Sequence, residues 1–274
     1  LPAAVVPVAV GAASAVGEPT DMVWWRVAAA LIVSLSLQVG VNYANDYSDG
    51  VRGTDDVRVG PTRLVASGLA SPSAVKRAAL LSFAVAAVAG LTIALSTSLI
   101  LLVVGAAAIA AGWFYTGGPK PYGYLGLGEV FVFVFFGLVA TAGTTFAAIE
   151  SVTALSLVMG SAVGALACAL LVINNLRDIP TDRAVGKKTL AVRLGDQRTR
   201  WFYVGLIGAA FVLSAVGAAW RLPVLLGLAA IPLAIRPVRS VLGGATGAAL
   251  IPVLGATGKL QLAWGLLVTV GLAL

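Results

Sequence analysis

Residues 23–49 read VWWRVAAALIVSLSLQVGVNYANDYSD, an apolar run that ends directly in asparagine and aspartate. Its apolar part, residues 23–43, is long enough to cross the hydrocarbon core of a bilayer, which takes about 20 residues. A second segment repeats the arrangement, because the apolar residues 153–174 continue directly into NNLRDIPTD, residues 174–182. A span that ends in carboxylates therefore occurs once in each half of the chain.

The composition places most of the chain inside a membrane. Of its 274 residues, 59% are hydrophobic and 11% are charged, against about 45–50% apolar and about 25% charged in soluble domains. We predict an all-α polytopic membrane protein of nine transmembrane helices. The predicted spans are residues 1–16, 23–43, 74–94, 98–115, 127–149, 153–174, 200–220, 222–241 and 258–274. The repeated acidic segments further predict one domain, 1–274, of two similar halves, about 1–125 and 126–274.

The distribution of charge predicts the orientation. With nine spans, the loops after the even-numbered spans and the span ends that adjoin them carry all but two of the 18 lysine and arginine residues, the exceptions being Arg26 and Arg221. Basic loops face the cytoplasm, so we expect a plasma-membrane protein with its long polar loops on the cytoplasmic side. Basic membrane loops also account for the net charge of +7, and we expect no nucleic-acid partner.

Several kinds of chemistry are excluded by residues that the chain lacks. It has no histidine and one cysteine, Cys168. Histidine general bases, Ser-His-Asp triads, histidine metal sites, internal disulfides and CxxC redox pairs are therefore excluded. Cys168 is expected to be a small buried side chain. Gly160 and Gly164, four residues apart in a span, indicate close packing between helices.

The two acidic segments predict a metal site. Residues three or four apart share a helix face, so Asp46 and Asp49 point one way if their helix continues. Asp178 and Asp182 do the same, although Pro180 works against a helix there. Carboxylates stacked on one face repel one another without a cation, and Mg²⁺ prefers such hard oxygen ligands together with substrate phosphates. An alternative interpretation is that these aspartates only mark helix ends at the water interface. Because a matching cluster occurs in each half of the chain, we favour the interpretation that two paired helices hold Mg²⁺ on a diphosphate.

Basic residues near the acidic segments are candidates for binding phosphate oxygens, although several of them are expected to be ordinary cytoplasmic anchors. They are Arg52, Arg63, Arg177, Lys187, Lys188 and Arg193, with Lys120 alone in the short loop between Tyr115 and Tyr122. The two tyrosines have a common alternative role as interfacial aromatics.

At these residues the chain resembles the UbiA-type intramembrane prenyltransferases over essentially its whole length. Two aspartate-rich motifs carry the resemblance: Asn45-Asp46-x-x-Asp49 and Asp178-x-x-x-Asp182. The chain departs from the family where the last aspartate of the first motif is replaced by Gly53, with Asp55 two residues later. Within the family, the segments 115–129 and 174–195 resemble the menaquinone branch, the 1,4-dihydroxy-2-naphthoate polyprenyltransferases.

The resemblance implies a helical bundle around a central cavity that opens to the cytoplasmic side and to lipid. It implies transfer of a polyprenyl group from its diphosphate to 1,4-dihydroxy-2-naphthoate, with loss of CO₂ and diphosphate, giving demethylmenaquinone. The implied cofactor is Mg²⁺, as a pair of ions held by Asp46, Asp49, Asp178 and Asp182. Tyr115 would shield the allylic cation and Lys188 would add positive charge at the reacting groups. The implied substrate-binding residues are Asn42, Asn45, Arg52, Asp55, Arg63, Lys120, Asn174, Asn175, Arg177, Lys187 and Arg193.

Other functions remain open from the sequence. A family member with another aromatic or lipid acceptor is the nearest alternative. A CDP-alcohol phosphotransferase would resemble Asp46-x-x-Asp49-Gly50, but it needs its second aspartate pair within the same short motif. A transporter or channel would place ionisable residues at mid-membrane, whereas the predicted span centres here are nearly free of charge. The sequence predicts neither the prenyl chain length nor the oligomeric state.

Overall fold

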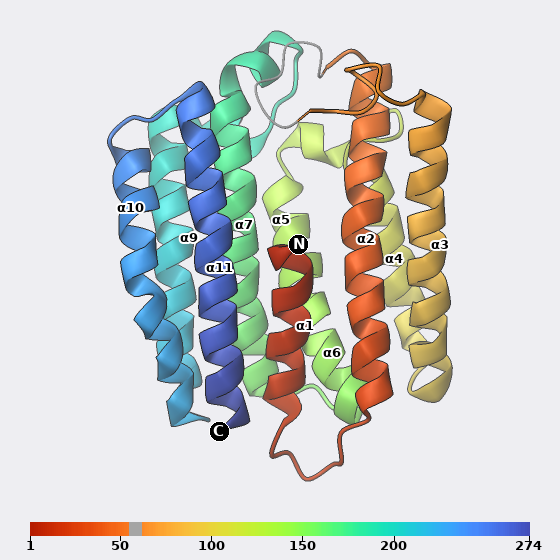
Figure 1. Ribbon diagram of the computed structural model, residues 1–274, viewed down its shortest axis with the longest axis vertical. Coiled ribbons are helices and arrows are strands. Elements are labelled where there is room, and N and C mark those ends of the chain that lie inside the picture. Colours follow the sequence, from red (N-terminus) through yellow and green to blue (C-terminus); the bar gives the residue numbers. More distant parts are fainter. Residues whose placement is uncertain (55–61) are drawn as a thin grey trace.

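The protein is an all-helical bundle, as the sequence predicts. The structure, a computed structural model, describes residues 1–54 and 62–274, and every regular element within these ranges is a helix. The long helices stand side by side (Figure 1). In the described residues, seven helical segments are long and apolar enough to cross a membrane: Trp24–Val51 (α2), Pro72–Ser96 (α3), Gly128–Ile149, Ala154–Ala184 (α7), Asp196–Gly217 (α9), Leu222–Leu242 and Gly247–Ala273.

Three of these segments join shorter elements end to end. Gly128–Ile149 consists of α5 (Gly128–Val132), the π-helical η2 (Phe133–Val139) and α6 (Ala140–Ile149). Leu222–Leu242 joins η3 (Leu222–Ala230) to α10 (Ile231–Leu242), and Gly247–Ala273 joins η4 (Gly247–Ala249) to α11 (Leu250–Ala273). The last segment thus begins well before the predicted span 258–274.

Two shorter apolar helices occupy the positions of the first and fourth predicted spans. They are α1 (Pro2–Ala15) and α4 (Ile100–Phe114). The remaining elements, η1 (Tyr122–Leu125) and α8 (Leu190–Leu194), lie in connections between the long helices. That the chain crosses the membrane nine times therefore stays a prediction.

The outer surface of the bundle suits a lipid environment. Large apolar side chains are exposed along α3, α4 and α9, among them Leu81, Val103 and Val212. Exposed tryptophans lie near helix ends, Trp24 at the start of α2 and Trp201 in the first turns of α9. Tryptophan is enriched at membrane–water interfaces. The chain is therefore built as an integral membrane protein.

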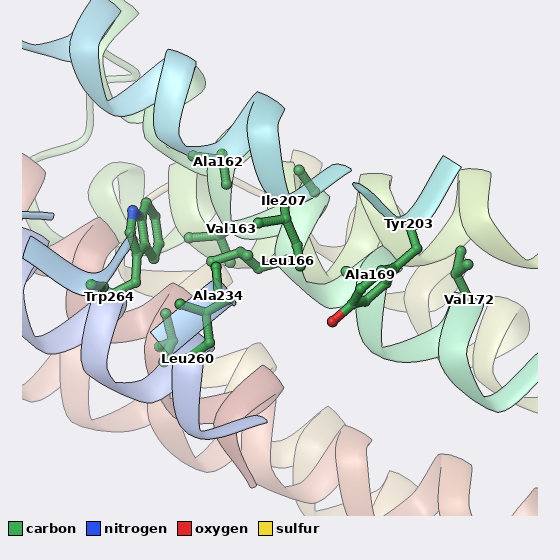
Figure 2. Close-up of a cluster of buried hydrophobic side chains, with 14 of the residues drawn as sticks. Ala162, Val163, Leu166, Ala169, Val172, Tyr203, Ile207, Ala234, Leu260 and Trp264 are labelled. Atoms are coloured by element: carbon green, nitrogen blue, oxygen red, sulfur yellow. The ribbon is translucent and has the colours of Figure 1, made fainter. Parts of the chain in front are cut away.

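The core lies around α7, the central helix of the C-terminal part. The most apolar stretch of α7 is 72% buried inside the bundle, against 17% for α2. Figure 2 shows its residues Val163 and Leu166 packed near Ile207 of α9 and Leu260 and Trp264 of α11. Such a fixed helix can hold polar side chains at a constant position relative to its neighbours.

The predicted close packing at Gly160 and Gly164 is confirmed. The two glycines face Gly137 of η2. A Cβ atom added to Gly137 would lie only 2.5 Å from the Cα of Gly164, so a larger residue does not fit there. Small residues let two helix backbones approach one another in a membrane. The contact brings the segment Gly128–Ile149 directly against α7.

Both acidic segments are helical. α2 continues past its predicted span to Val51, and α7 continues through Pro180 to Ala184. A proline inside a helix removes one backbone hydrogen bond, but α7 continues as a helix beyond Pro180. The aspartates consequently lie near the C-terminal ends of two helices, where the helix dipole disfavours negative charge. They require compensating donors or cations.

Candidate active site

The two acidic segments line one cavity of about 830 Å³. Apolar walls from α2, α4 and the segment Gly128–Ile149 form most of it, including Leu37, Val104 and Phe135. Its polar residues include Asn42, Asn45, Asp46, Asp49, Arg63, Tyr115, Thr116, Tyr124, Asn174, Asn175, Asp178, Thr181, Asp182 and Lys187. The cavity thus combines a polar region with a longer apolar one.

Asp46 and Asp49, in the last two turns of α2, are held by different donors. The carboxylate of Asp46 accepts hydrogen bonds from the backbone N–H groups of Leu64 (2.9 Å) and Val65 (3.0 Å). Asp49 accepts from the hydroxyl of Tyr124 at 2.6 Å and lies 3.3 Å from the ammonium of Lys187. These donors offset the unfavourable end of the helix dipole.

Asp178 and Asp182 lie on α7, on the other side of the cavity. Both oxygens of Asp178 accept from the guanidinium of Arg177, at 2.6 and 2.7 Å. Arg177 is buried and does not itself line the cavity. Asp182 is buried, and its backbone carbonyl accepts from the N–H of Lys187 at 2.8 Å. The turn after α7 therefore places Lys187 between the two acidic segments.

Lys187 and Tyr124 form the link between the segments. The ammonium of Lys187 lies 4.6 Å from the ring centroid of Tyr124, and the guanidinium of Arg52 lies 5.6 Å from the same centroid. Burial, the charge of Asp49 and the hydrogen bond to Asp49 raise the pKa of Tyr124, so its hydroxyl stays protonated and donates. Burial is the largest single influence on the pKa of Lys187 and lowers it, but Asp49, Tyr124 and Asp182 together raise the pKa above its ordinary value. The ammonium thus stays charged.

Comparison with known proteins agrees with this geometry. The sequence profile of the UbiA prenyltransferase family matches residues 4–243. The chain belongs to the UbiA prenyltransferase family. It is 52% identical over 273 residues to the 1,4-dihydroxy-2-naphthoate octaprenyltransferase of Mycobacterium tuberculosis, covering 100% of this chain and 93% of the relative. It is 35% identical over 272 residues to the enzyme of that name from Escherichia coli, covering 93% and 88%.

Solved structures of UbiA homologues share the fold. One from Aeropyrum pernix K1 matches with a TM-score of 0.74 at 15% identity, over 98% of this chain and 96% of that one. One from Archaeoglobus fulgidus, bound to DMAPP and Mg²⁺, matches with a TM-score of 0.61 at 15% identity, over 98% and 96%. At this identity the likeness concerns the fold alone.

The basic residues predicted at the site of this UbiA family member separate into two groups. Arg63 and Lys187 line the cavity. Among the described residues, Arg52, Lys120, Arg177, Lys188 and Arg193 are not part of its lining. Lys188 is exposed, its backbone N–H donates to the carbonyl of Tyr124, and its own carbonyl accepts from Arg193 at 3.1 Å. The geometry therefore places Lys188 and Arg193 in support of the loop rather than at the cavity.

Arg52 clamps the loop that follows α4. Its guanidinium donates to the backbone carbonyls of Thr116 and Gly118. The hydroxyl of Thr116 in turn donates to the side-chain oxygen of Asn45 at 2.8 Å. Arg52 thus holds the segment that brings Tyr115 to the cavity wall. Lys120 is exposed, and Asp55, also predicted to bind substrate, lies outside the described residues.

Sequence reasoning did not single out Tyr124 or Glu129 as site residues. Tyr124 lies in η1. Glu129 is the second residue of α5, and its carboxylate accepts from the amide of Asn175 at 2.9 Å. The only signal was their position inside the segment 115–129 that resembles the menaquinone branch. Their partners come from α2 and α7, distant in the sequence.

Tyr124→Phe is expected to lower turnover about tenfold or more, because hydrogen bonds to charged groups contribute about 1.5–3 kcal/mol. The variant keeps the ring beside Lys187 and removes only the hydroxyl that donates to Asp49. Turnover and the KM for polyprenyl diphosphate would be measured with purified protein. Tyr203→Phe is the matched control. The hydroxyl of Tyr203 is hydrogen-bonded to the hydroxyl of Thr257 in the core (2.7 Å), and Tyr203 does not line the cavity. Full turnover of Tyr124→Phe would show that Asp49 does not depend on this contact.

Proposed function

We propose that this chain transfers a polyprenyl group from polyprenyl diphosphate to 1,4-dihydroxy-2-naphthoate, with release of diphosphate and CO₂. The observation that carries the proposal is one cavity lined by both aspartate pairs and by a long apolar wall. The names of the full-length relatives at 52% and 35% identity support the acceptor. Membership of the family disfavours a phosphotransferase or a transporter.

The donor groups of the cavity fit Mg²⁺. Carboxylate and amide oxygens are hard ligands of the kind that Mg²⁺ prefers. In residues 1–54 and 62–274, no three acidic side chains are grouped closely enough to hold an ion alone. Mg²⁺ commonly binds through one or two carboxylates and completes its shell with substrate phosphates and water. We assign Asp46, Asp49, Asp178 and Asp182 as ligands of a pair of ions that come with the diphosphate.

When bound, Mg²⁺ neutralises charge on the leaving diphosphate. Lys187 and Arg63 supply further positive charge in the polar region, and Asn42, Asn45 and Asn174 offer amide groups to phosphate oxygens or water. The apolar wall holds the isoprenoid chain and keeps water from the reacting carbon. Tyr115 also lines the cavity, and the negative face of its π system would stabilise an allylic cation.

The prenyl transfer and the loss of CO₂ require no general base from the protein. The bond between the first prenyl carbon and the diphosphate oxygen breaks, and that carbon bonds to the ring carbon that bears the carboxylate. The ring then loses its carboxylate as CO₂, and the electron pair of that bond restores the aromatic ring. The product is demethylmenaquinone in its hydroquinone form. The absence of histidine in the sequence is compatible with this chemistry.

We further propose that the enzyme lies in the plasma membrane with the polar end of the cavity at the cytoplasmic face. Support comes from the sequence, in which all lysine and arginine residues except Arg26 and Arg221 fall in the loops and span ends predicted for one side. Arg26, at the start of α2, and Arg221, just before η3, lie at the opposite end. The positive-inside rule makes the basic end cytoplasmic.

Incubation of the purified protein with a polyprenyl diphosphate and carboxyl-labelled 1,4-dihydroxy-2-naphthoate should release diphosphate and labelled CO₂ in equal amounts. Both products would be followed with Mg²⁺ present, and 4-hydroxybenzoate would serve as the alternative acceptor. Equal release follows because each transfer breaks one C–O bond and one ring–carboxylate bond. Diphosphate release without CO₂ would assign another acceptor and overturn the proposed one.

A further inference from the structure

Glu129 is a buried carboxylate that the proposed chemistry does not use. It is 5% exposed and lies behind the cavity wall rather than in its lining. One carboxylate oxygen, Oε1, accepts from the side-chain amide of Asn175; the other, Oε2, is buried without a hydrogen-bond partner in the part of the chain that the structure describes. A buried polar group without a partner is destabilising, and more so when it is charged. The chain carries this group despite that cost.

Helix α7 holds Glu129 at two points. The thiol of Cys168 donates to the backbone carbonyl of Glu129 at 3.1 Å, and the amide of Asn175 donates to its side chain at 2.9 Å. Cys168 and Asn175 are seven residues apart and therefore lie on one face of the helix. Asp178 follows Asn175 by less than one turn. Glu129 is thus fixed relative to the part of α7 that faces the cavity.

The contact also fixes the orientation of the Asn175 amide. A side-chain amide has a donor end and an acceptor end, and rotation about its last bond exchanges them. Since the nitrogen of Asn175 is bonded to Glu129, the oxygen is the end left for the cavity, which Asn175 lines. An amide oxygen accepts from a hydroxyl group or binds a cation, and it does not bind a phosphate oxygen.

Three aromatic side chains form part of the wall of the same cavity. The rings of Tyr122 and Phe131 stack with centroids 3.9 Å apart, and Tyr115 meets Tyr122 edge-on at 5.5 Å. All three line the cavity, and Phe131 follows Glu129 by two residues. A flat aromatic ring packs well against such a wall. The cations of the cavity, in contrast, lie at Lys187 and Arg63.

We propose that Glu129 is a positioning residue for the aromatic acceptor: it holds Asn175 so that the amide oxygen accepts a hydrogen bond from an aryl hydroxyl group. The inference rests on the proposed function, because it assumes a hydroxylated aromatic acid as the acceptor. It places the acceptor between Asn175 and the aromatic wall, and the diphosphate at the aspartates and Lys187.

Steady-state kinetics of Glu129→Ala, Glu129→Gln, Asn175→Ala and the double alanine variant test this inference. Glu129→Ala and Asn175→Ala should each raise the KM for the acceptor about tenfold while the KM for polyprenyl diphosphate stays within about twofold. Glu129→Gln keeps an oxygen that accepts from Asn175, so it should stay within about threefold of the wild type. The double variant should be no worse than Asn175→Ala, since Glu129 acts through Asn175.

A melting curve in detergent identifies variants that do not fold, and Glu150→Gln, at the far end of the bundle, is the matched control. The inference is overturned if Asn175→Ala leaves the acceptor KM unchanged, if Glu129→Gln is as harmful as Glu129→Ala, or if the two alanine effects multiply. A wild-type protein without prenyl transfer to the naphthoate would instead refute the proposed function. Wild-type transfer with unchanged variants would refute only the role of Glu129.

Discussion

Replacing Asp49 or Asp178 by alanine is expected to lower turnover at least about a hundredfold, the usual effect of removing one group that stabilises developing charge. Asp49 belongs to α2 and Asp178 to α7, and both line the same cavity. Without Asp49, the buried ammonium of Lys187 also loses its partner at 3.3 Å. Asp46→Ala and Asp182→Ala are expected to have effects of the same size. Single-turnover rates with polyprenyl diphosphate and 1,4-dihydroxy-2-naphthoate would measure them.

Asp21→Ala is the control for these variants, because Asp21 is an exposed carboxylate in the connection between α1 and α2, away from the cavity. Its turnover should equal that of the wild type. Melting temperatures in detergent separate lost chemistry from lost folding. Near-normal activity in any two of the four cavity variants would contradict a site built from both acidic segments.

Removal of divalent cations is expected to lower activity at least about a hundredfold, and added Mg²⁺ should restore it, because the charge of the leaving diphosphate would otherwise be unneutralised. The cavity offers Lys187 and Arg63 as its own cations, yet four carboxylates line the same cavity. Activity would be measured after EDTA treatment and again after Mg²⁺ in excess of the chelator. Because protein groups donate hydrogen bonds to Asp46, Asp49 and Asp178, EDTA treatment should change the melting temperature little. An unchanged rate in EDTA would exclude the proposed role of the metal.

The fold could be predicted because burial in lipid leaves a strong sequence signal. Long apolar runs have few alternatives to a membrane helix, so the helices are found where the runs lie. Helix ends were less predictable. The predicted spans end where polarity rises, but α2 continues to Val51 and α7 continues through Pro180. Tertiary contacts of Asp46 and Asp49 stabilise the last turns of α2. The count of nine spans and the division into two halves stay predictions.

Only part of the site could be predicted from the sequence. Whether a site residue could be recognised depends on whether local sequence or a distant contact gives it its role. The aspartates are unusual at the end of an apolar helix, so local sequence identifies them. Lys187 and Lys188 are adjacent and chemically identical, and only the turn after α7 directs Lys187 to Asp49 and leaves Lys188 exposed. Tyr124 and Glu129 acquire their roles through partners on other helices. Such long-range contacts leave no pattern in a single sequence.

The most direct test of one shared site is a crystal structure of the protein with Mn²⁺ and an unreactive polyprenyl thiolodiphosphate. Mn²⁺ replaces Mg²⁺ at oxygen ligands, and its anomalous scattering locates the ions independently of the chain. We expect anomalous peaks inside the cavity, with ligands from Asp46 or Asp49 of α2 and from Asp178 or Asp182 of α7. Peaks held by the aspartates of one helix alone, or a diphosphate bound without any peak, would contradict it.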